Sequence, residues 1–246
     1  MPCNTVPIGS NKEISPGVWR LEAPFSGDIR AGQFFMLKCP EGAALLPRAI
    51  SVCDYDGETV TFLYQVVGRG TGELSRLQAG DKLTLTGPLG NGFPVEELQG
   101  KIALVGGGIG VAPMVYTAKV LRQMGKDVHA LCGYRDVPFY ADELEQAAGA
   151  LDIATETGNH GAKGFVTGIL EPSRYDAVLC CGPEPMMKAV TGQCMAAGTP
   201  VYVSLENKMA CGIGACLVCT CADKDGKNRR TCKDGPVFRG EEIDFA

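Results

Sequence analysis

Four cysteines near the C-terminal end have the spacing of iron–sulfur ligands. Four residues separate Cys211 from Cys216, two separate Cys216 from Cys219, and twelve separate Cys219 from Cys232. This is the plant-type spacing for a two-iron, two-sulfur (2Fe–2S) cluster, in which one tight loop supplies three thiolates and a distant segment supplies the fourth. Two glycines in the loop let its backbone N–H groups approach the inorganic sulfides. The spacing therefore predicts that these four thiolates hold a 2Fe–2S cluster.

Three other uses of these thiols fit the spacing less well and stay open at this point. Zinc prefers two short Cys-x2–4-Cys pairs, whereas only Cys232 stands in the second half of this pattern. A redox dithiol built on CLVC would begin a helix and would not need the neighbouring cysteines. A disulfide framework is unusual in the cytosol. Cys221 lies just outside the pattern, and we expect it to take no part.

A glycine-rich turn, VGGGIGVAPM (105–114), predicts a binding site for a nucleotide phosphate. Its glycines are Gly106, Gly107, Gly108 and Gly110, and they depart from the G-x-G-x-x-G pattern. Any tight turn would explain the glycines alone, but this turn joins a buried strand to a helix, so its N–H groups face outward for an anion. The segments CGYRD (132–136) and CGPEPMM (181–187) end two further strands, which predicts one elongated nucleotide site.

Two segments in the N-terminal part suggest a second phosphate-containing ligand. In RAIS (48–51), Arg48 can make charge-assisted bonds to a pyrophosphate, and Ser51 can bond a flavin ring or a ribityl oxygen. In GRGTGELS (68–75), the glycines and Thr71 suit a loop at phosphates. Taken alone, the two segments are equally compatible with a solvated arginine and an ordinary turn.

The elements that must position these residues fall into three zones. Residues 1–98 contain short apolar runs separated by Gly or Pro, which predicts an antiparallel β-barrel. Residues 99–205 alternate apolar strands with helical segments, which predicts a parallel-sheet, nucleotide-binding α/β domain. Residues 206–246 form the cysteine-rich tail, which we expect to be a small iron–sulfur domain. The predicted fold class is thus α/β plus β.

Composition and charge exclude several classes of protein. The chain of 246 residues is 45% hydrophobic and 21% charged. Such a composition is typical of a soluble globular protein. The net charge of −5 argues against a nucleic-acid partner. No apolar run is long enough to cross a membrane, and the first residues do not form a secretory signal. We therefore expect a cytoplasmic location and no membrane partner.

Several of these motifs together resemble the ferredoxin–NADP reductase family, which pairs a FAD-binding barrel with a nicotinamide-binding α/β domain. The resemblance rests on RAIS, GRGTGELS, GPLGNGF, VGGGIGVAP and CGPEPMM. The tail VSLENKMACGIGACLVCTC and the segment TETGNHGAKGFVT are similar to the electron-transfer subunits of NAD-dependent (class B) dihydroorotate dehydrogenases. The match runs through nearly the whole chain.

The resemblance implies FAD, NAD and a 2Fe–2S cluster as cofactors, without a catalytic acid–base residue, because hydride moves directly between flavin and nicotinamide. The residues implied along FAD are Arg48, Ala49, Ile50, Ser51, Gln65, Val66, Val67, Gly70, Thr71, Gly72 and Glu73. Those implied at the nicotinamide are Gly106, Gly107, Gly108, Gly110, Cys181, Gly182 and Pro183. Two positions depart from the family. The family often has Pro where this chain has Ala49. It usually has an aromatic residue where this chain has Ile50, so we expect no stacking contact at Ile50.

The resemblance also implies a partner and a role in pyrimidine (UMP) biosynthesis. An FMN-containing catalytic subunit would oxidise dihydroorotate, and its electrons would pass through the cluster and FAD to NAD+, in a heterotetramer of two copies of each chain. We expect Ile213, Leu217 and Val218 to dock this subunit, or merely to cover the cluster. Arg135 would suit a 2′-phosphate and Asp136 would repel one, so the sequence leaves the choice between NAD and NADP open.

The sequence leaves two alternative functions open. One is an NAD(P)H-oxidoreductase subunit of a related complex, of the hydrogenase, sulfide dehydrogenase or transhydrogenase type. The other is a non-catalytic module that binds zinc in its tail.

Overall fold

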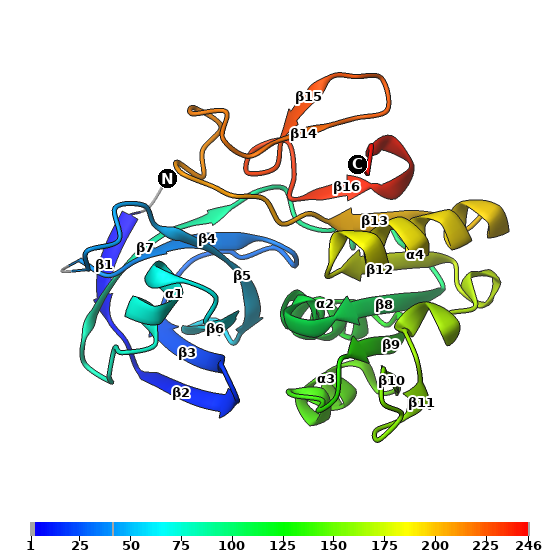
Figure 1. Ribbon diagram of the computed structural model, residues 1–246, viewed down its shortest axis with the longest axis horizontal. Coiled ribbons are helices and arrows are strands. Elements are labelled where there is room, and N and C mark those ends of the chain that lie inside the picture. Colours follow the sequence, from blue (N-terminus) through cyan, green and yellow to red (C-terminus); the bar gives the residue numbers. More distant parts are fainter. Residues whose placement is uncertain (1–2, 41, 246) are drawn as a thin grey trace.

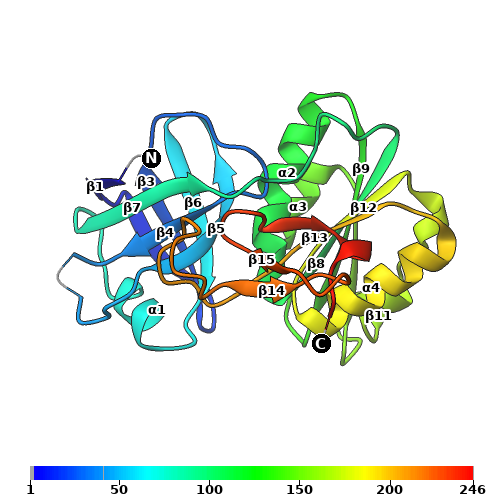
Figure 2. The same cartoon turned by 90° about the horizontal axis from the view of Figure 1, so that it is seen from above.

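The chain forms two sheets that stand side by side, with the cysteine-rich tail lying across one end of both (Figure 1). The structure is a computed structural model that describes residues 3–40 and 42–245. Seen from above, the tail lies over the junction between the two lobes (Figure 2). None of the helices in the described ranges has the length and apolarity that a membrane span requires.

The first lobe is a curved, antiparallel, seven-stranded sheet in the order β1-β7-β4-β5-β6-β3-β2. Its inner face packs large apolar side chains. The Phe35 ring makes an edge-to-face contact with Phe25 at a centroid distance of 5.1 Å and another with Phe62 at 5.6 Å, a geometry that aromatic rings favour. The predicted barrel-type fold is confirmed. The elements are β1 (Cys3–Pro7), β2 (Ser10–Ser15), β3 (Val18–Pro24), β4 (Phe34–Lys38), β5 (Arg48–Tyr55), β6 (Thr59–Gln65), α1 (Arg69–Leu74) and β7 (Lys82–Leu89).

The second lobe is a sheet in the order β11-β10-β9-β8-β12-β13-β16, in which strands β8 to β13 pair in parallel. Apolar strands alternate with helices, because each crossover must cover a face of a sheet that is buried on both sides. The elements are β8 (Lys101–Gly107), α2 (Ala112–Gln123), β9 (Asp127–Tyr134), α3 (Ala141–Ala148), β10 (Leu151–Thr155), β11 (Ala162–Lys163), β12 (Ala177–Cys181), α4 (Glu184–Ala197) and β13 (Val201–Ser204). Short 3₁₀ turns span Gly108–Val111, Val166–Gly168 and Pro172–Arg174.

The tail forms a small hairpin and then returns to the second sheet. Strands β14 (Thr220–Ala222) and β15 (Asn228–Arg230) pair with each other, and β16 (Val237–Arg239) pairs antiparallel with β13. A 3₁₀ turn, Gly240–Glu242, follows. The predicted all-parallel sheet thus carries one antiparallel edge strand from outside its zone. This strand covers the free edge of β13 and buries Val237 and Phe238.

Contacts between the lobes hold the two sheets in a defined relation. Helix α2 packs against β5, and the Tyr116 hydroxyl donates to the Ile29 carbonyl at 3.2 Å. Lys119 on α2 forms an ion pair with Asp54 on β5. The strand that begins with RAIS is therefore braced against the helix that follows the glycine-rich turn.

Replacing Leu104 by Ala tests the central core of the second lobe. Leu104 lies in β8 and is fully buried. The cavity left behind should lower the free energy of unfolding by about 2–5 kcal/mol in urea denaturation. The control is Met195→Ala, at a half-exposed position on α4. A surface substitution of this kind should change the free energy by only about 0.5 kcal/mol or less. Equal losses in both variants would contradict this assignment of the core.

Candidate functional site

The four cysteines of the predicted cluster site lie together as two pairs. Cys216 lies beside Cys211 and lowers its pKa, and Cys219 lies beside Cys232 and raises its pKa. The backbone N–H of Cys232 donates to the Cys219 sulfur at 3.4 Å, and that of Gly214 donates to the Cys232 sulfur at 3.1 Å. Folding therefore brings the distant fourth cysteine to the loop, as the spacing requires.

The pairing of the thiols fits a binuclear cluster better than a single metal ion. Within residues 3–40 and 42–245, no three His, Cys, Asp or Glu side chains converge as ligands of one ion. A structural zinc needs four ligands around one centre, whereas each iron of a 2Fe–2S cluster takes two thiolates. The donor set is all sulfur and is divided two and two, so these residues fit the predicted cluster.

The two pairs have different surroundings. Burial opposes ionisation of Cys211, but hydrogen bonds from Ile213, Cys216 and Ala215 outweigh it and lower the pKa of this thiol to about 6. Burial and the neighbouring Cys219 raise the pKa of Cys232 to about 12. Hydrogen bonds to a thiolate favour its charged form, whereas burial disfavours it. One pair thus faces polar groups near the surface, and the other lies in an apolar environment.

Backbone conformation in the cysteine loop is unusual at three positions. Gly212 and Gly214 have φ of 71° and 80°, and a Cβ on either would come within 2.6 Å of Met36 and 2.7 Å of Lys233, respectively. The predicted need for glycine here therefore has two causes, positive φ and close packing. Leu217 also has a positive φ of 60°. This region is uncommon for a bulky residue and costs about 1–2 kcal/mol.

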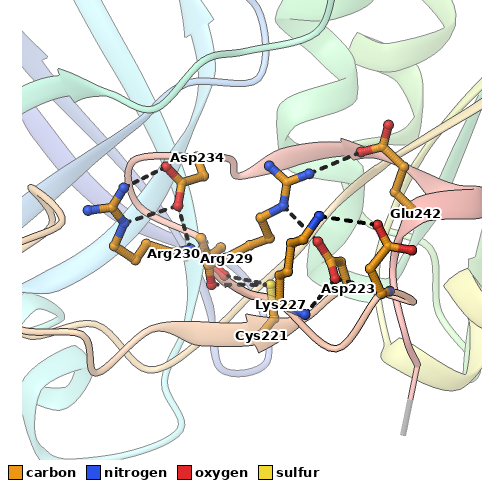
Figure 3. A network of polar contacts seen from close by, with 9 residues as sticks. Cys221, Asp223, Lys227, Arg229, Arg230, Asp234 and Glu242 are labelled. Carbon is orange, nitrogen blue, oxygen red and sulfur yellow. Dashed lines mark hydrogen bonds and ion pairs between the residues drawn. The ribbon is translucent and has the colours of Figure 1, made fainter.

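A network of charged groups fixes the segment that carries Cys232 (Figure 3). Arg230 and Asp234 form a two-pronged ion pair at 2.9 and 3.0 Å across the turn that contains this cysteine. Arg229 bonds the buried carboxylate of Asp223 at 3.1 Å, which ties β15 to the end of β14. Ion pairs of this geometry restrict the hairpin more than isolated surface pairs would.

The motif GPLGNGF supplies the joint between the first lobe and the tail. Asn91 donates to the carbonyls of Val237 and Asp234 at 2.9 and 3.2 Å, and its own side-chain oxygen accepts the Val237 N–H at 3.2 Å. A Cβ on Gly90 would overlap Pro236, so the two segments of the chain are in direct contact here. Sequence reasoning treated this motif only as a family marker and missed its structural role.

The buried cysteine pair packs directly on the first sheet. Cys219 and Cys232 form an apolar group with Phe34, Met36 and Leu89, which come from β4 and β7. Ala49 of the RAIS segment, on β5, is a partly buried member of the same group and lies opposite Met36 in the strand register. The predicted cluster ligands and the predicted flavin strand therefore pack into the same apolar group.

The predicted flavin segments RAIS and GRGTGELS also meet. A Cβ on Gly70 would overlap the Arg48 guanidinium, so only glycine allows this approach. The prediction that GRGTGELS is a phosphate loop was wrong in form, because residues 69–74 fold as helix α1. The Thr71 hydroxyl accepts the N–H of Val67 at 3.0 Å and that of Gly68 at 3.3 Å. These bonds occupy N–H groups that precede the first turn of α1 and fix the entry of the chain into the helix.

Three further predicted flavin residues already have protein partners. The Glu73 carboxylate accepts the Ala44 N–H at 3.0 Å and pairs with Arg69. The backbone N–H of Val66 donates to Gly17 at 2.8 Å, and that of Val67 is bonded to Thr71. The exposed side chains of Val66 and Val67 remain free to face a ligand, and Gln65 is exposed at the end of β6.

The predicted nicotinamide residues form one surface at the carboxyl ends of β8 and β12. Cys181 lies opposite Gly106 in the strand register. A Cβ on Gly110 would overlap the Cys181 carbonyl, and one on Gly107 would lie 3.0 Å from Pro183. Close approach of the two loops thus accounts for glycine at these positions, and likewise at Gly182. Gly108 instead has a positive φ of 53°, which glycine adopts without strain.

A carboxylate that sequence reasoning missed lies beside this surface. Glu206 follows β13, and its pKa is raised because the neighbouring protein partly removes the carboxylate from water. Burial, together with Glu206 and Cys180, raises the pKa of Cys181 well above its usual value, against a hydrogen bond with Ser204. Burial of this kind favours the neutral form of both groups. Cys181 is therefore a buried neutral thiol, which does not act as a thiolate nucleophile.

Comparison with known proteins points to one family across the whole chain. A family model described as the iron–sulfur cluster binding domain of dihydroorotate dehydrogenase B matches residues 206–244. Over 240 residues the chain is 48% identical to the protein named dihydroorotate dehydrogenase B (NAD(+)), electron transfer subunit, of Clostridium perfringens, covering 97% of this chain and 96% of the relative. The protein of the same name from Clostridium acetobutylicum is 49% identical over 236 residues, covering 96% and 95%.

Solved structures support the same fold. An NADH-dependent reduced ferredoxin–NADP oxidoreductase, studied for flavin-based electron bifurcation, superposes with a TM-score of 0.88 at 30% identity, covering 98% of this chain and 90% of that one. A ferredoxin–NADP+ reductase from Neisseria gonorrhoeae with bound FAD and NADP has a TM-score of 0.65 at 20% identity, covering 84% and 94%. The second likeness concerns the fold alone.

Replacing Asn91 by Ala tests the joint between the first lobe and the tail. The change leaves two carbonyls and one N–H without their partner, so the free energy of unfolding should fall by about 1–3 kcal/mol. The tail should also become more sensitive to limited proteolysis. Asn228→Ala, at an exposed position in β15, is the control and should behave like the wild type. An unaltered digestion pattern in the Asn91 variant would rule out this role.

Proposed function

This chain belongs to the family of dihydroorotate dehydrogenase B electron-transfer subunits, and we propose that it carries electrons from a dihydroorotate-oxidising partner subunit to NAD+. The observation that carries this proposal is the apolar group that the buried cysteine pair shares with residues of β4, β5 and β7. Ala49, Cys219 and Cys232 share one apolar group, so a cluster on these thiolates and a flavin along RAIS would be close neighbours. Electron tunnelling falls steeply with distance and therefore needs such proximity.

The residues present fit the three cofactors that this function needs. Cys211, Cys216, Cys219 and Cys232 would hold the 2Fe–2S cluster. The chemistry that FAD supplies when bound is conversion between single electrons at the cluster and the electron pair of a hydride. The residues that we propose for FAD are Arg48, Ala49, Ile50, Ser51, Gln65, Val66, Val67, Gly70, Thr71, Gly72 and Glu73; those for NAD are Gly106, Gly107, Gly108, Gly110, Cys181, Gly182 and Pro183.

The protein's own side chains would orient these groups and exclude water from them. Arg48, held against α1, places a fixed positive charge for a pyrophosphate. Phe34, Met36 and Leu89 keep water away from the buried thiolates. The neutral thiol of Cys181 offers a close, uncharged contact for a nicotinamide ring. No side chain is required to transfer a proton.

We propose that the partner is an FMN-containing catalytic subunit, and that it docks on the exposed side of the cysteine loop. Ile213, Leu217 and Val218 are 46%, 63% and 54% exposed and surround the surface pair of thiols, of which Cys216 is exposed. Leu217 keeps a strained backbone conformation although its side chain is in solvent. Strain of this kind concentrates at functional segments, which favours docking over mere coverage of the cluster.

The remaining parts of the proposal concern the assembly and its setting. Two copies of each subunit would form a heterotetramer in the cytoplasm and would serve pyrimidine (UMP) biosynthesis. We also keep the division into a FAD-binding part (1–98), a NAD-binding part (99–205) and a cluster part (206–246) as a proposal. The two Clostridium relatives are named as subunits of a dihydroorotate dehydrogenase that uses NAD+, which supports dihydroorotate as the electron donor and NAD+ as the acceptor.

A second candidate function is an electron-transfer subunit of another NAD(P)H-linked complex. The similarity at 30% identity to an NADH-dependent reduced ferredoxin–NADP oxidoreductase favours it as the alternative. Such a subunit would share the cofactors but would not accept electrons from dihydroorotate. The identity of the electron donor therefore separates the two.

Reconstitution with the catalytic subunit encoded in the same genome tests the proposed function. Anaerobically prepared complex should reduce NAD+ at the expense of dihydroorotate. Cys219→Ser should lose iron, acid-labile sulfide and this activity, but should keep NADH oxidation with ferricyanide, which needs only FAD. The neighbouring Cys221→Ser is the matched control and should retain all three. Full dihydroorotate-dependent activity in a cluster-free Cys219 variant would refute the electron path.

Substitution of Leu217 tests the docking surface. Leu217→Asp should weaken binding of the catalytic subunit by about ten-fold or more, as loss of an exposed anchor at an interface does. Leu217→Gly removes the same side chain while relieving the strain, so it should weaken binding without loss of stability or iron. Met195→Asp, also half-exposed but on α4, is the control. Calorimetry that gives unchanged dissociation constants for both Leu217 variants would exclude docking at this loop.

A further inference from the structure

A groove of about 780 Å³ lies between the two lobes, away from the cysteine-rich tail. One wall carries Ile14 on β2, Arg20 on β3 and Asp54 on β5, and the other wall consists of residues from α2 and α3. Strands β2 and β3 and helix α3 lie at the end of the molecule opposite the tail (Figure 1). Because side chains do not fill the junction here as they fill a core, specific bonds across the groove must fix the relation of the lobes on this side.

Two pairs of side chains bridge this groove. The Arg20 Nε donates to the Tyr140 hydroxyl at 3.2 Å, which joins β3 to the residue that precedes α3. Lys119 on α2 forms an ion pair with Asp54 on β5. Burial raises the pKa of Tyr140 to about 12, so its hydroxyl stays neutral at physiological pH and accepts the bond from the guanidinium. Both helices of one wall are therefore bonded to strands of the other wall.

Tyr140 has a strained backbone conformation at the point where it meets Arg20. Its φ of 58° and ψ of 24° lie in the left-handed region, which a bulky residue rarely adopts. Such strain persists only where the surrounding structure enforces it, and it concentrates at functional segments. The bond to Arg20 is thus made although the local backbone preference opposes the turn from which Tyr140 reaches the groove.

The bridged elements include the two that carry the proposed flavin and nicotinamide sites. Strand β5 begins with RAIS and has Asp54 near its other end. Helix α2 follows the glycine-rich turn directly and has Lys119 on its third turn. A packed strand and a packed helix move as stiff units, so a bond between Asp54 and Lys119 also restrains RAIS relative to the turn. Reacting atoms must come within about 3–3.5 Å of each other, and a small tilt between their supports is enough to slow a reaction.

We propose that the pairs Arg20–Tyr140 and Lys119–Asp54 are positioning contacts, which set the rate of hydride transfer by holding the flavin strand in register with the nicotinamide turn. This inference rests on the proposed function and names residues outside its cofactor sites. The transfer moves two electrons and one proton together, so NADH becomes NAD+ as FAD becomes FADH−. Because neither pair includes a proposed cofactor ligand, its loss lowers the transfer rate and leaves binding of the nucleotide nearly unchanged. The Lys119 side chain is 42% exposed, so the ion pair adds little to global stability.

Rapid anaerobic mixing of the cofactor-loaded, full-length chain with NADH separates binding from transfer. Lys119→Met and Tyr140→Phe should each lower the limiting rate of flavin reduction by about ten-fold, as misplaced reacting groups do, and should change the dissociation constant of NADH by less than about two-fold. Lys119→Arg keeps the ion pair and should retain most of the rate. Lys82→Met is the matched control, because it removes an exposed lysine of β7 that does not line the groove, and it should behave like the wild type.

Urea denaturation of the same chain checks the ion pair independently of activity. Lys119→Met, Asp54→Asn and the double variant should show a coupling of at least about two-fold in the unfolding constant. An unchanged limiting rate in Lys119→Met or Tyr140→Phe, additive effects in urea, or a wild type whose flavin NADH does not reduce would overturn the inference. If the limiting rates fall as expected but dihydroorotate does not drive NAD+ reduction, the proposed function fails and the positioning role stands.

Discussion

The structure depends on the packing of Cys219 and Cys232 against the outside of the first sheet. An iron–sulfur centre works only if electrons can reach it and leave it, and electron transfer falls steeply with distance. Phe34, Met36 and Leu89 bury one pair of thiols in an apolar group against which Ala49 of β5 also packs, and the other pair of thiols stays at the surface. The cysteine site therefore has one pair of thiols facing the first lobe and one pair facing solvent.

The tail keeps this position because the segment after Cys232 is bound to both lobes. Asn91 binds the segment after Cys232 to the end of the first lobe, and β16 adds that segment to the edge of the second sheet. Before this segment, the ion pairs of Arg229 with Asp223 and of Arg230 with Asp234 hold the hairpin together. The tail therefore belongs structurally to both lobes, and its position in turn restricts how the lobes move relative to each other.

Charge is distributed along the molecule according to what each part must bind. The cysteine loop combines exposed apolar side chains with N–H groups that point at sulfur, and the β5 strand begins with a fixed arginine. At the place that we propose for the nicotinamide, burial keeps the Cys181 thiol neutral. At the far end of the sheet, Asp136 presents an anchored negative charge.

The sequence by itself determined the features that depend on neighbouring residues. The cysteine spacing, the strand from Arg48 to Tyr55 and the alternation of strands and helices after residue 99 were all predicted, because local spacing and apolar periodicity control them. Only the tertiary structure decided that Gly70 lies against Arg48, that Asn91 holds the tail, that β16 completes the second sheet and that Asp136 meets Thr157. These pairs are far apart in the chain or depend on the conformations of loops. Their contacts are therefore decided by the packing of whole elements, which a short sequence pattern does not predict.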